Sequence, residues 1–230
     1  MLLAYGDLNL PTNVPANQYI LIKGEKASAS RGVGKNLNDY LDEWNPDSLR
    51  YALASILPEQ NDSEISEDEM IRRNNEELVA AWGNLVQRVF SQYINNFENL
   101  EFDFELTDVD KKIIDEGNDC FEKTGELIEK VELKSSLQSV MGYVNKINAY
   151  LNETEPWKVI KEDSSRATAI LHTSLTAIEA CASLFTPFMP TTSEIVKGAI
   201  EKNTNNNWSV NDIKKGAPLQ DIGHLFKKFD

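Results

Sequence analysis

Residues 71–93 place the strongest limit on how this chain can fold, because their apolar side chains recur with helical spacing. Intervals of three and four residues put one set on a single face that can be buried: Leu78, Ala81, Leu85 and Val89. Asn84 and Arg88 are also four residues apart, so they project together from another face. An amide beside a guanidinium suits hydrogen bonding to base edges or phosphates. A solvated Asn and a surface Arg are the simpler interpretation of the same spacing.

Helical periodicity continues through the rest of the chain. It predicts further helices that start at Thr107 and over residues 133–151, 164–185 and 191–202. Asp110, three residues after Thr107, suggests a capping box at the start of the first of these. Pro156 should end or kink the helix before it and hold Trp157 at the bend. The pattern favours a mainly α fold, an antiparallel bundle of about five helices.

Residues 1–60 differ from this pattern and predict a small α/β segment. We expect a strand at 19–22, a mobile basic loop or surface hairpin at 23–36, and short helices at 38–44 and 48–56, the second capped by Asp47. Residues 59–69 and 95–106 are acidic and polar connections, and the tail from residue 203 is loop-like with an apolar end at Ile222, Leu225 and Phe226. The chain is therefore expected to have two domains, residues 1–60 and 61–230.

Charge and composition exclude several kinds of function. The net charge of −14 over 230 residues argues against non-specific nucleic-acid binding, but not against a site built on stacking and hydrogen bonds. No run of about 18 apolar residues and no basic N-terminal region occur, so neither a membrane segment nor a signal peptide is expected. Cys120 and Cys181 lie in apolar periodic segments, which suggests reduced core thiols in a cytoplasmic protein. Without a CxxC or a Cys/His cluster, no metal site is expected.

Three separated stretches carry a family resemblance. The first is GEKASASRG at 24–32 with DSLRY at 47–51, the second is RNNEELV at 73–79 with Asn84 and Arg88, and the third is EPW at 155–157 with FTPFMP at 185–190. In this order and spacing they resemble the C-terminal part of methionyl-tRNA synthetases, which are class I aminoacyl-tRNA synthetases. The resemblance covers essentially the whole chain, from the signature-loop segment through the helical anticodon-binding domain.

The resemblance implies a site for the anticodon. It assigns Asn84, Arg88 and Trp157 to reading the CAU anticodon of methionine tRNA. The chemistry agrees, because an unpaired base can stack on an indole ring while amide and guanidinium groups bond its edge. The alternative for Trp157 is a core aromatic that fills the space under the Pro156 kink.

The signature loop departs from the family pattern. Here it consists of Lys26, Ala27, Ser28, Ala29 and Ser30. Ala29 stands where the family has a second lysine that supports the ATP phosphates, and Ala27 stands where it has methionine. The paired-histidine HIGH motif is absent from this sequence, since His172 lies in an apolar helix and His224 in the tail. We therefore expect no catalytic residue and no cofactor in this chain, ATP with Mg²⁺ only in the parent enzyme, and no activity of the chain alone.

Three functions are compatible with these observations. The first is a tRNA-binding part, or truncated paralogue, of a methionyl-tRNA synthetase, favoured by the joint presence of Asn84, Arg88 and Trp157. The second is a catalytically inert helical protein-interaction module, favoured by the acidic charge and by Ala29. The third is an enzyme completed by a separate catalytic chain, which Ala29 argues against. Binding of methionine tRNA and of an anticodon-mutated control separates the first two.

Overall fold

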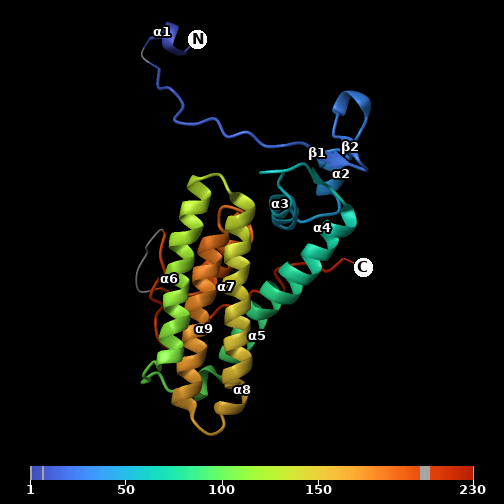
Figure 1. The fold of residues 1–230 in the computed structure, drawn as a ribbon. Coiled ribbons are helices and arrows are strands. Elements are labelled where there is room, and N and C mark those ends of the chain that lie inside the picture. Colours follow the sequence, from blue (N-terminus) through green and yellow to red (C-terminus); the bar gives the residue numbers. More distant parts are fainter. Residues whose placement is uncertain (1, 7, 203–207, 230) are drawn as a thin grey trace.

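The computed structural model describes residues 2–6, 8–202 and 208–229, and the protein is mainly helical (Figure 1). Its α-helices are α1 Leu2–Tyr5, α2 Leu37–Leu41, α3 Pro46–Ser55, α4 Glu67–Arg73, α5 Asn84–Asn96, α6 Asp108–Glu129, α7 Leu133–Thr154, α8 Pro156–Val159, α9 Ser164–Phe185 and α10 Pro190–Ala199. A π-helix, Asn74–Gly83, joins α4 to α5, and short 3-10 turns lie at Ala29–Arg31 and Phe97–Asn99. The strands are β1 Ile20–Ile22, β2 Glu25–Lys26 and β3 Ser63–Glu64.

A small sheet forms the first part of the chain. Its strand order is β2-β1-β3, with β1 antiparallel to β2 and parallel to β3. Lys23 and Gly24, both at positive φ, make the tight turn between β1 and β2. The segment predicted as a basic loop is thus partly a hairpin. The acidic segment predicted as a linker contains β3 and the start of α4.

Long helices form the second part. α9 lies at the centre and packs on α6, α7, α5 and α10. From Ala167 to Phe185 all its residues are buried, as expected for a central helix in which Glu179 is the one Asp, Glu, Lys or Arg side chain of that stretch. By length and composition α9 could cross a membrane, but 94% of its apolar window is buried inside the protein. The predicted fold, a helical bundle preceded by a small α/β segment, is confirmed.

The predicted helix at 71–93 is confirmed as the middle of a longer helical run, with one change in its buried face. Leu78, Leu85 and Val89 are buried as predicted, but Ala81 is only partly covered and Trp82 is buried instead. The π-helix explains this difference. Its i→i+5 hydrogen bonds make each turn wider than an α-turn, so the core face falls one residue later than α spacing predicts.

Several element ends differ from their predictions. Asn45, not Asp47, caps α3, because its side chain accepts the Asp47 backbone N–H at 2.9 Å and Pro46 fills the first helical position. α2 ends at Leu41 rather than Trp44, and α10 ends at Ala199. The capping box between Thr107 and Asp110 is confirmed.

The C-terminal tail crosses back over the first part of the bundle. Residues 203–207 of the predicted tail lie outside the described residues, and the part from 208 to 229 contains no helix, as predicted. Asn74 donates to the carbonyl of Lys227 at 2.9 Å, and the Asn75 amide pairs with both the N–H and the carbonyl of Phe229. The Phe229 ring lies 4.2 Å from that of Trp44, so the tail closes a second small core beside α3 and α4.

Candidate nucleic-acid interface

Helix α8 lies at the end of the bundle farthest from the sheet (Figure 1), and its Trp157 contacts Arg88 of α5. Arg88 lies on α5, one turn after the exposed Asn84, and Trp157 lies on α8. The Arg88 guanidinium sits over the indole ring, 5.3 Å from its centroid, within the range of a cation–π contact. It also donates to Asn152 Oδ1 of α7 at 3.0 Å. Three helices therefore fix one partly exposed cation beside one aromatic ring.

The break between α7 and α8 presents Trp157. α7 ends at Thr154, and Glu155 adopts the left-handed conformation with φ of 42°. Pro156 is buried at the first position of α8, where its missing N–H costs nothing. The predicted break at Pro156 is confirmed. Trp157 is partly exposed rather than enclosed under the kink.

A hollow of about 240 Å³ opens beside this pair. Its floor is apolar and formed by Val89, Leu151 and Leu171, each buried. Pro156, Trp157 and Arg88 line it as well, and the polar side chains around it are Gln87, Ser91 and Gln92. A flat apolar floor with a few polar groups suits a small planar ring. The structure thus brings Arg88 and Trp157 together at this hollow, while Asn84 lies outside its lining.

Sequence reasoning missed Gln92 as a candidate for this site. It follows Arg88 by four residues, so Asn84, Arg88 and Gln92 form one polar ridge along α5. The signal was present in the sequence, because the four-residue spacing that relates Asn84 to Arg88 continues for one more turn.

A buried charge network braces the helix ends next to the site. Asp110 at the start of α6 is 0% exposed and accepts hydrogen bonds from Tyr150 of α7 at 2.5 Å and from Arg166 of α9 at 2.9 Å. Burial alone would raise the pKa of Asp110, but the hydrogen bonds from Arg166, Tyr150 and Thr107 outweigh it and hold this pKa below its usual value. The network joins three helices just before the α7–α8 break.

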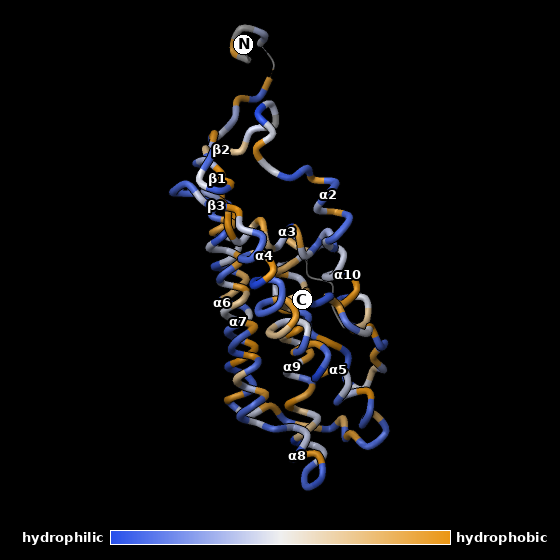
Figure 2. The backbone as a smooth tube through the Cα atoms, turned by 90° about the vertical axis from the view of Figure 1, so that its right-hand side faces the viewer, coloured by the Kyte–Doolittle hydropathy of each residue, from blue (hydrophilic) through white to orange (hydrophobic). Residues whose placement is uncertain are grey.

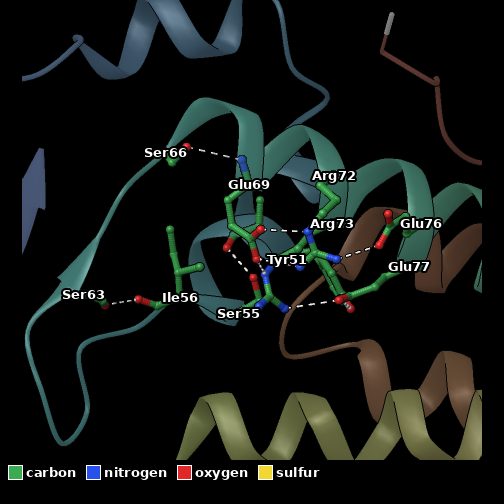
Figure 3. A network of polar contacts seen from close by, with 11 residues as sticks. Tyr51, Ser55, Ile56, Ser63, Ser66, Glu69, Arg72, Arg73, Glu76 and Glu77 are labelled. Atoms are coloured by element: carbon green, nitrogen blue, oxygen red, sulfur yellow. Dashed lines mark hydrogen bonds and ion pairs between the residues drawn. The ribbon is translucent and has the colours of Figure 1, made fainter. Parts of the chain in front are cut away.

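The stretches that carry the family resemblance contact one another at a second place, where α3 joins the bundle. The Tyr51 hydroxyl donates to Glu77 of the π-helix, and Arg73 bridges Glu77 and Glu69 at 3.2 and 2.8 Å (Figure 3). Burial, and then the neighbouring Glu77, raise the pKa of the Tyr51 phenol far above its usual value, so it stays a donor. Arg72 extends the network to Glu76 at 2.6 Å.

α3 is also tied to the turn between α9 and α10. Arg50 donates to the carbonyls of Pro187 and Phe188, both at 2.9 Å. Asp47, 1% exposed, accepts the N–H and hydroxyl of Thr192 at 2.6 and 2.8 Å. The DSLRY stretch therefore acts as a structural joint between the first segment and the bundle.

The signature loop lies near the sheet, at the opposite end of the molecule from α8 (Figure 2). The Lys26 ammonium rests on the Tyr19 ring, 3.4 Å from its centroid, and the hydroxyl oxygens of Ser28 and Ser30 are 3.2 Å apart. Residue 29 is an alanine and supplies no charge. These residues do not provide the pair of cations that the family resemblance associates with ATP phosphates.

The remaining candidate residues have structural roles. His172 is 8% exposed and packs on Phe104 within the core, and His224 is exposed. Both cysteines are free and buried, as predicted. In the described part of the chain, no three His, Cys, Asp or Glu side chains gather as metal ligands would.

Comparison with known proteins identifies two family matches. Residues 1–90 match the model for "tRNA synthetases class I (M)", and residues 103–230 match the model for "Anticodon binding domain of methionyl tRNA ligase". A methionine–tRNA ligase of Chloroflexus aggregans is 40% identical over 81% of this chain, and one of Roseiflexus castenholzii is 38% identical over all of it.

Solved structures show the same fold. The free form of Mycobacterium tuberculosis methionyl-tRNA synthetase superposes with a TM-score of 0.84 at 18% identity, covering 99% of this chain and 46% of that one. The same enzyme in complex with methionyl-adenylate gives 0.80 at 21% identity, covering 92% of this chain and 43% of that one. The chain spans 31% and 44% of the length of the Chloroflexus and Roseiflexus relatives. By these matches the chain belongs to the methionyl-tRNA ligase family, and it comprises a class I synthetase segment followed by the anticodon-binding domain.

Proposed function

We propose that this chain binds methionine tRNA by its anticodon loop, with Asn84, Arg88 and Trp157 as the residues that read the CAU bases. In this role it is the anticodon-binding part of a methionyl-tRNA synthetase, whose reaction joins methionine to its tRNA with ATP. The observation that carries the proposal is the Arg88 guanidinium over the partly exposed Trp157 ring, beside a hollow, in a chain of this family.

Stacking and hydrogen bonds, rather than charge, would supply the affinity. The net charge of −14 repels an RNA backbone at long range. A base stacked on an aromatic ring contributes about 1–3 kcal/mol whatever that charge is. Arg88 and Asn84 can then bond the exposed edges of neighbouring bases, which is how unpaired RNA loops are usually read.

The same site argues against the inert protein-interaction module. Such a module has no use for a guanidinium held by Asn152 over an accessible indole ring.

Removal of the indole ring tests the proposal directly. We expect Trp157→Ala to weaken binding of methionine tRNA by about 1–3 kcal/mol, the loss of one base–aromatic stack. It should change little for a tRNA with another anticodon. Filter binding with both tRNAs measures the two affinities.

Trp208 offers a matched control. It is 40% exposed, but it lies against α6 and donates to the Phe121 carbonyl at 3.0 Å. Trp208→Ala should therefore leave tRNA binding unchanged. Equal losses in the two variants, or no loss in Trp157→Ala, would refute the proposed site.

A second proposal concerns the catalytic part of the enzyme. The N-terminal arm is the chain before β1, described at residues 2–6 and 8–19. Large apolar side chains are exposed along this arm and along α2: Leu3, Tyr5, Leu8, Leu10, Val14, Tyr19, Leu37 and Leu41. Leu3, Tyr5 and Val14 are 76–81% exposed, and Figure 1 shows the arm extending away from the bundle. We propose that a class I catalytic domain covers this surface, in the same polypeptide or as a separate chain.

We further propose that ATP is used by that catalytic domain and not by this chain. Ala29 in the signature loop and the absence of a HIGH motif from this sequence support this assignment. The cytoplasm is the compartment we propose, because both cysteines are free thiols.

A further inference from the structure

Gln92 is one of the polar residues that line the hollow beside Trp157. It lies on α5 one turn beyond Arg88, and it lines the same hollow as Arg88 and Trp157. The floor there is apolar and the indole ring forms part of the lining, so a base could be held by its faces but not selected by them. Selection requires a group on the rim that bonds the base edge.

The Gln92 amide is available for that bond. Within the described residues its side chain has no hydrogen-bond partner, whereas the nearby Gln87 amide donates to Ser91 Oγ at 3.4 Å. A glutamine amide offers one donor and one acceptor side by side, which is the pairing that base edges accept bidentately. An unpaired amide on the rim of an apolar hollow is therefore suited to reading one base.

The polar ridge on α5 is also long enough for Asn84 and Gln92 to contact different bases. Asn84 and Gln92 are two turns apart, about 12 Å along the helix. Asn84 lies outside the lining of the hollow and Gln92 inside it, so the two amides are placed to contact different parts of a loop that binds here.

We propose that Gln92 is a specificity-determining residue of this site, whose amide pairs with the edge of the single anticodon base that enters the hollow beside Trp157. The inference rests on the proposed function. It adds a residue to which the family resemblance assigns no role, and it specifies that this residue contacts a single anticodon base.

Binding of RNA hairpins tests the inference. The full chain and its Gln92→Leu variant are titrated with a labelled anticodon hairpin carrying CAU and with hairpins in which each anticodon base is changed singly. Leucine keeps the approximate volume but cannot form the hydrogen bonds. For the CAU hairpin we expect Gln92→Leu to bind roughly five- to 150-fold more weakly, the range for one paired base edge.

If Gln92 determines specificity, its effect should be confined to one of the three anticodon positions. Changing one anticodon base should cost the parent chain the same factor and cost the Gln92→Leu variant almost nothing, while changes at the other two bases should penalise both proteins alike. Gln138→Leu is the matched control, because Gln138 is an exposed glutamine on α7 outside this hollow. It should behave as the parent chain.

Two results would overturn the inference while leaving the proposed function in place. One is an unchanged CAU affinity in Gln92→Leu while Trp157→Ala still weakens it. The other is a loss of the same size for all four hairpins, which would make Gln92 a general contact. No binding of the CAU hairpin to the parent chain would overturn the inference and the proposed function together.

Discussion

His172 should make the stability of this domain depend on pH. It lies in the middle of α9, 8% exposed, with its ring 5.0 Å from that of Phe104. Burial lowers the pKa of His172 to about 4, with Asp212 opposing the shift and Lys215 adding to it. The folded protein therefore keeps this imidazole neutral at a pH where an exposed histidine would be charged.

The sign and size of the effect follow from that difference. An unfolded chain takes up a proton on His172 near pH 6.5, and the folded one only near pH 4. The stabilisation is complete above the unfolded pKa and is lost as the pH falls toward the folded pKa. At about 1.4 kcal/mol for each pH unit, the free energy of unfolding should fall by roughly 3 kcal/mol across this window.

Urea unfolding of the parent chain, His172→Leu and His224→Gln, each at several pH values, measures the contribution of His172 to the free energy of unfolding. In His172→Leu the site stays apolar and cannot titrate, so the part of the pH dependence due to His172 disappears. Contributions from Asp110 and the other carboxyls are common to both proteins and cancel in the difference. His224→Gln removes an exposed histidine and should follow the parent chain. If the parent and His172→Leu lose stability in parallel between about pH 6.5 and 4, the burial argument is wrong.

Two further predictions concern the proposed catalytic domain. The chain alone should form no methionyl-adenylate in a pyrophosphate exchange assay with methionine and ATP. Ala29→Lys should not restore it, because one phosphate contact cannot replace an absent pocket, and exchange clearly above a buffer blank would contradict this. In size-exclusion chromatography the chain should co-elute with the remaining part of a relative such as the Roseiflexus castenholzii ligase. The triple variant Leu3→Ser, Tyr5→Ser and Val14→Ser should not, and co-elution of that variant would argue against docking through the arm.

The long helices could be predicted from the sequence because their packing follows a local rule. The apolar positions of α7 and α9 repeat with α-helical spacing, and the core they enter is continuous, so the pattern and the burial agree. Trp82 shows where that rule fails. A π-helix changes the phase of the buried face without any change in composition, and spacing arguments assume an α-turn throughout.

The tail and the joint at α3 could not be predicted, because each depends on contacts between residues far apart in the sequence. The tail has no periodicity, and its path is set by the amides of Asn74 and Asn75 and by the ring of Trp44. Asp47 has a residue type typical of a helix cap, yet it is buried against Thr192, which follows it by 145 positions. A local reading of the sequence can assign such residues only their commonest local role.

The candidate site was predictable in part for the same reason. Asn84 and Arg88 share a face by local spacing, and Pro156 ends a helix by local geometry. That Trp157 then lies beside Arg88 depends on how α5, α7 and α8 pack. The role of Gln92 needs the hollow itself, which forms between α5, α8, α9 and the end of α7.

The fold separates the proposed anticodon site from the signature loop in space. The signature loop lies near the sheet and the Arg88–Trp157 pair lies near α8 at the far end of the bundle. Between them runs α7, which has 22 residues and is about 33 Å long (Figure 1). No side chain can reach across that distance, so the change to Ala29 does not alter the stacking surface of Trp157. A substitution at one end can therefore leave the other unchanged, and a chain with a degenerate signature loop can still present the proposed anticodon surface.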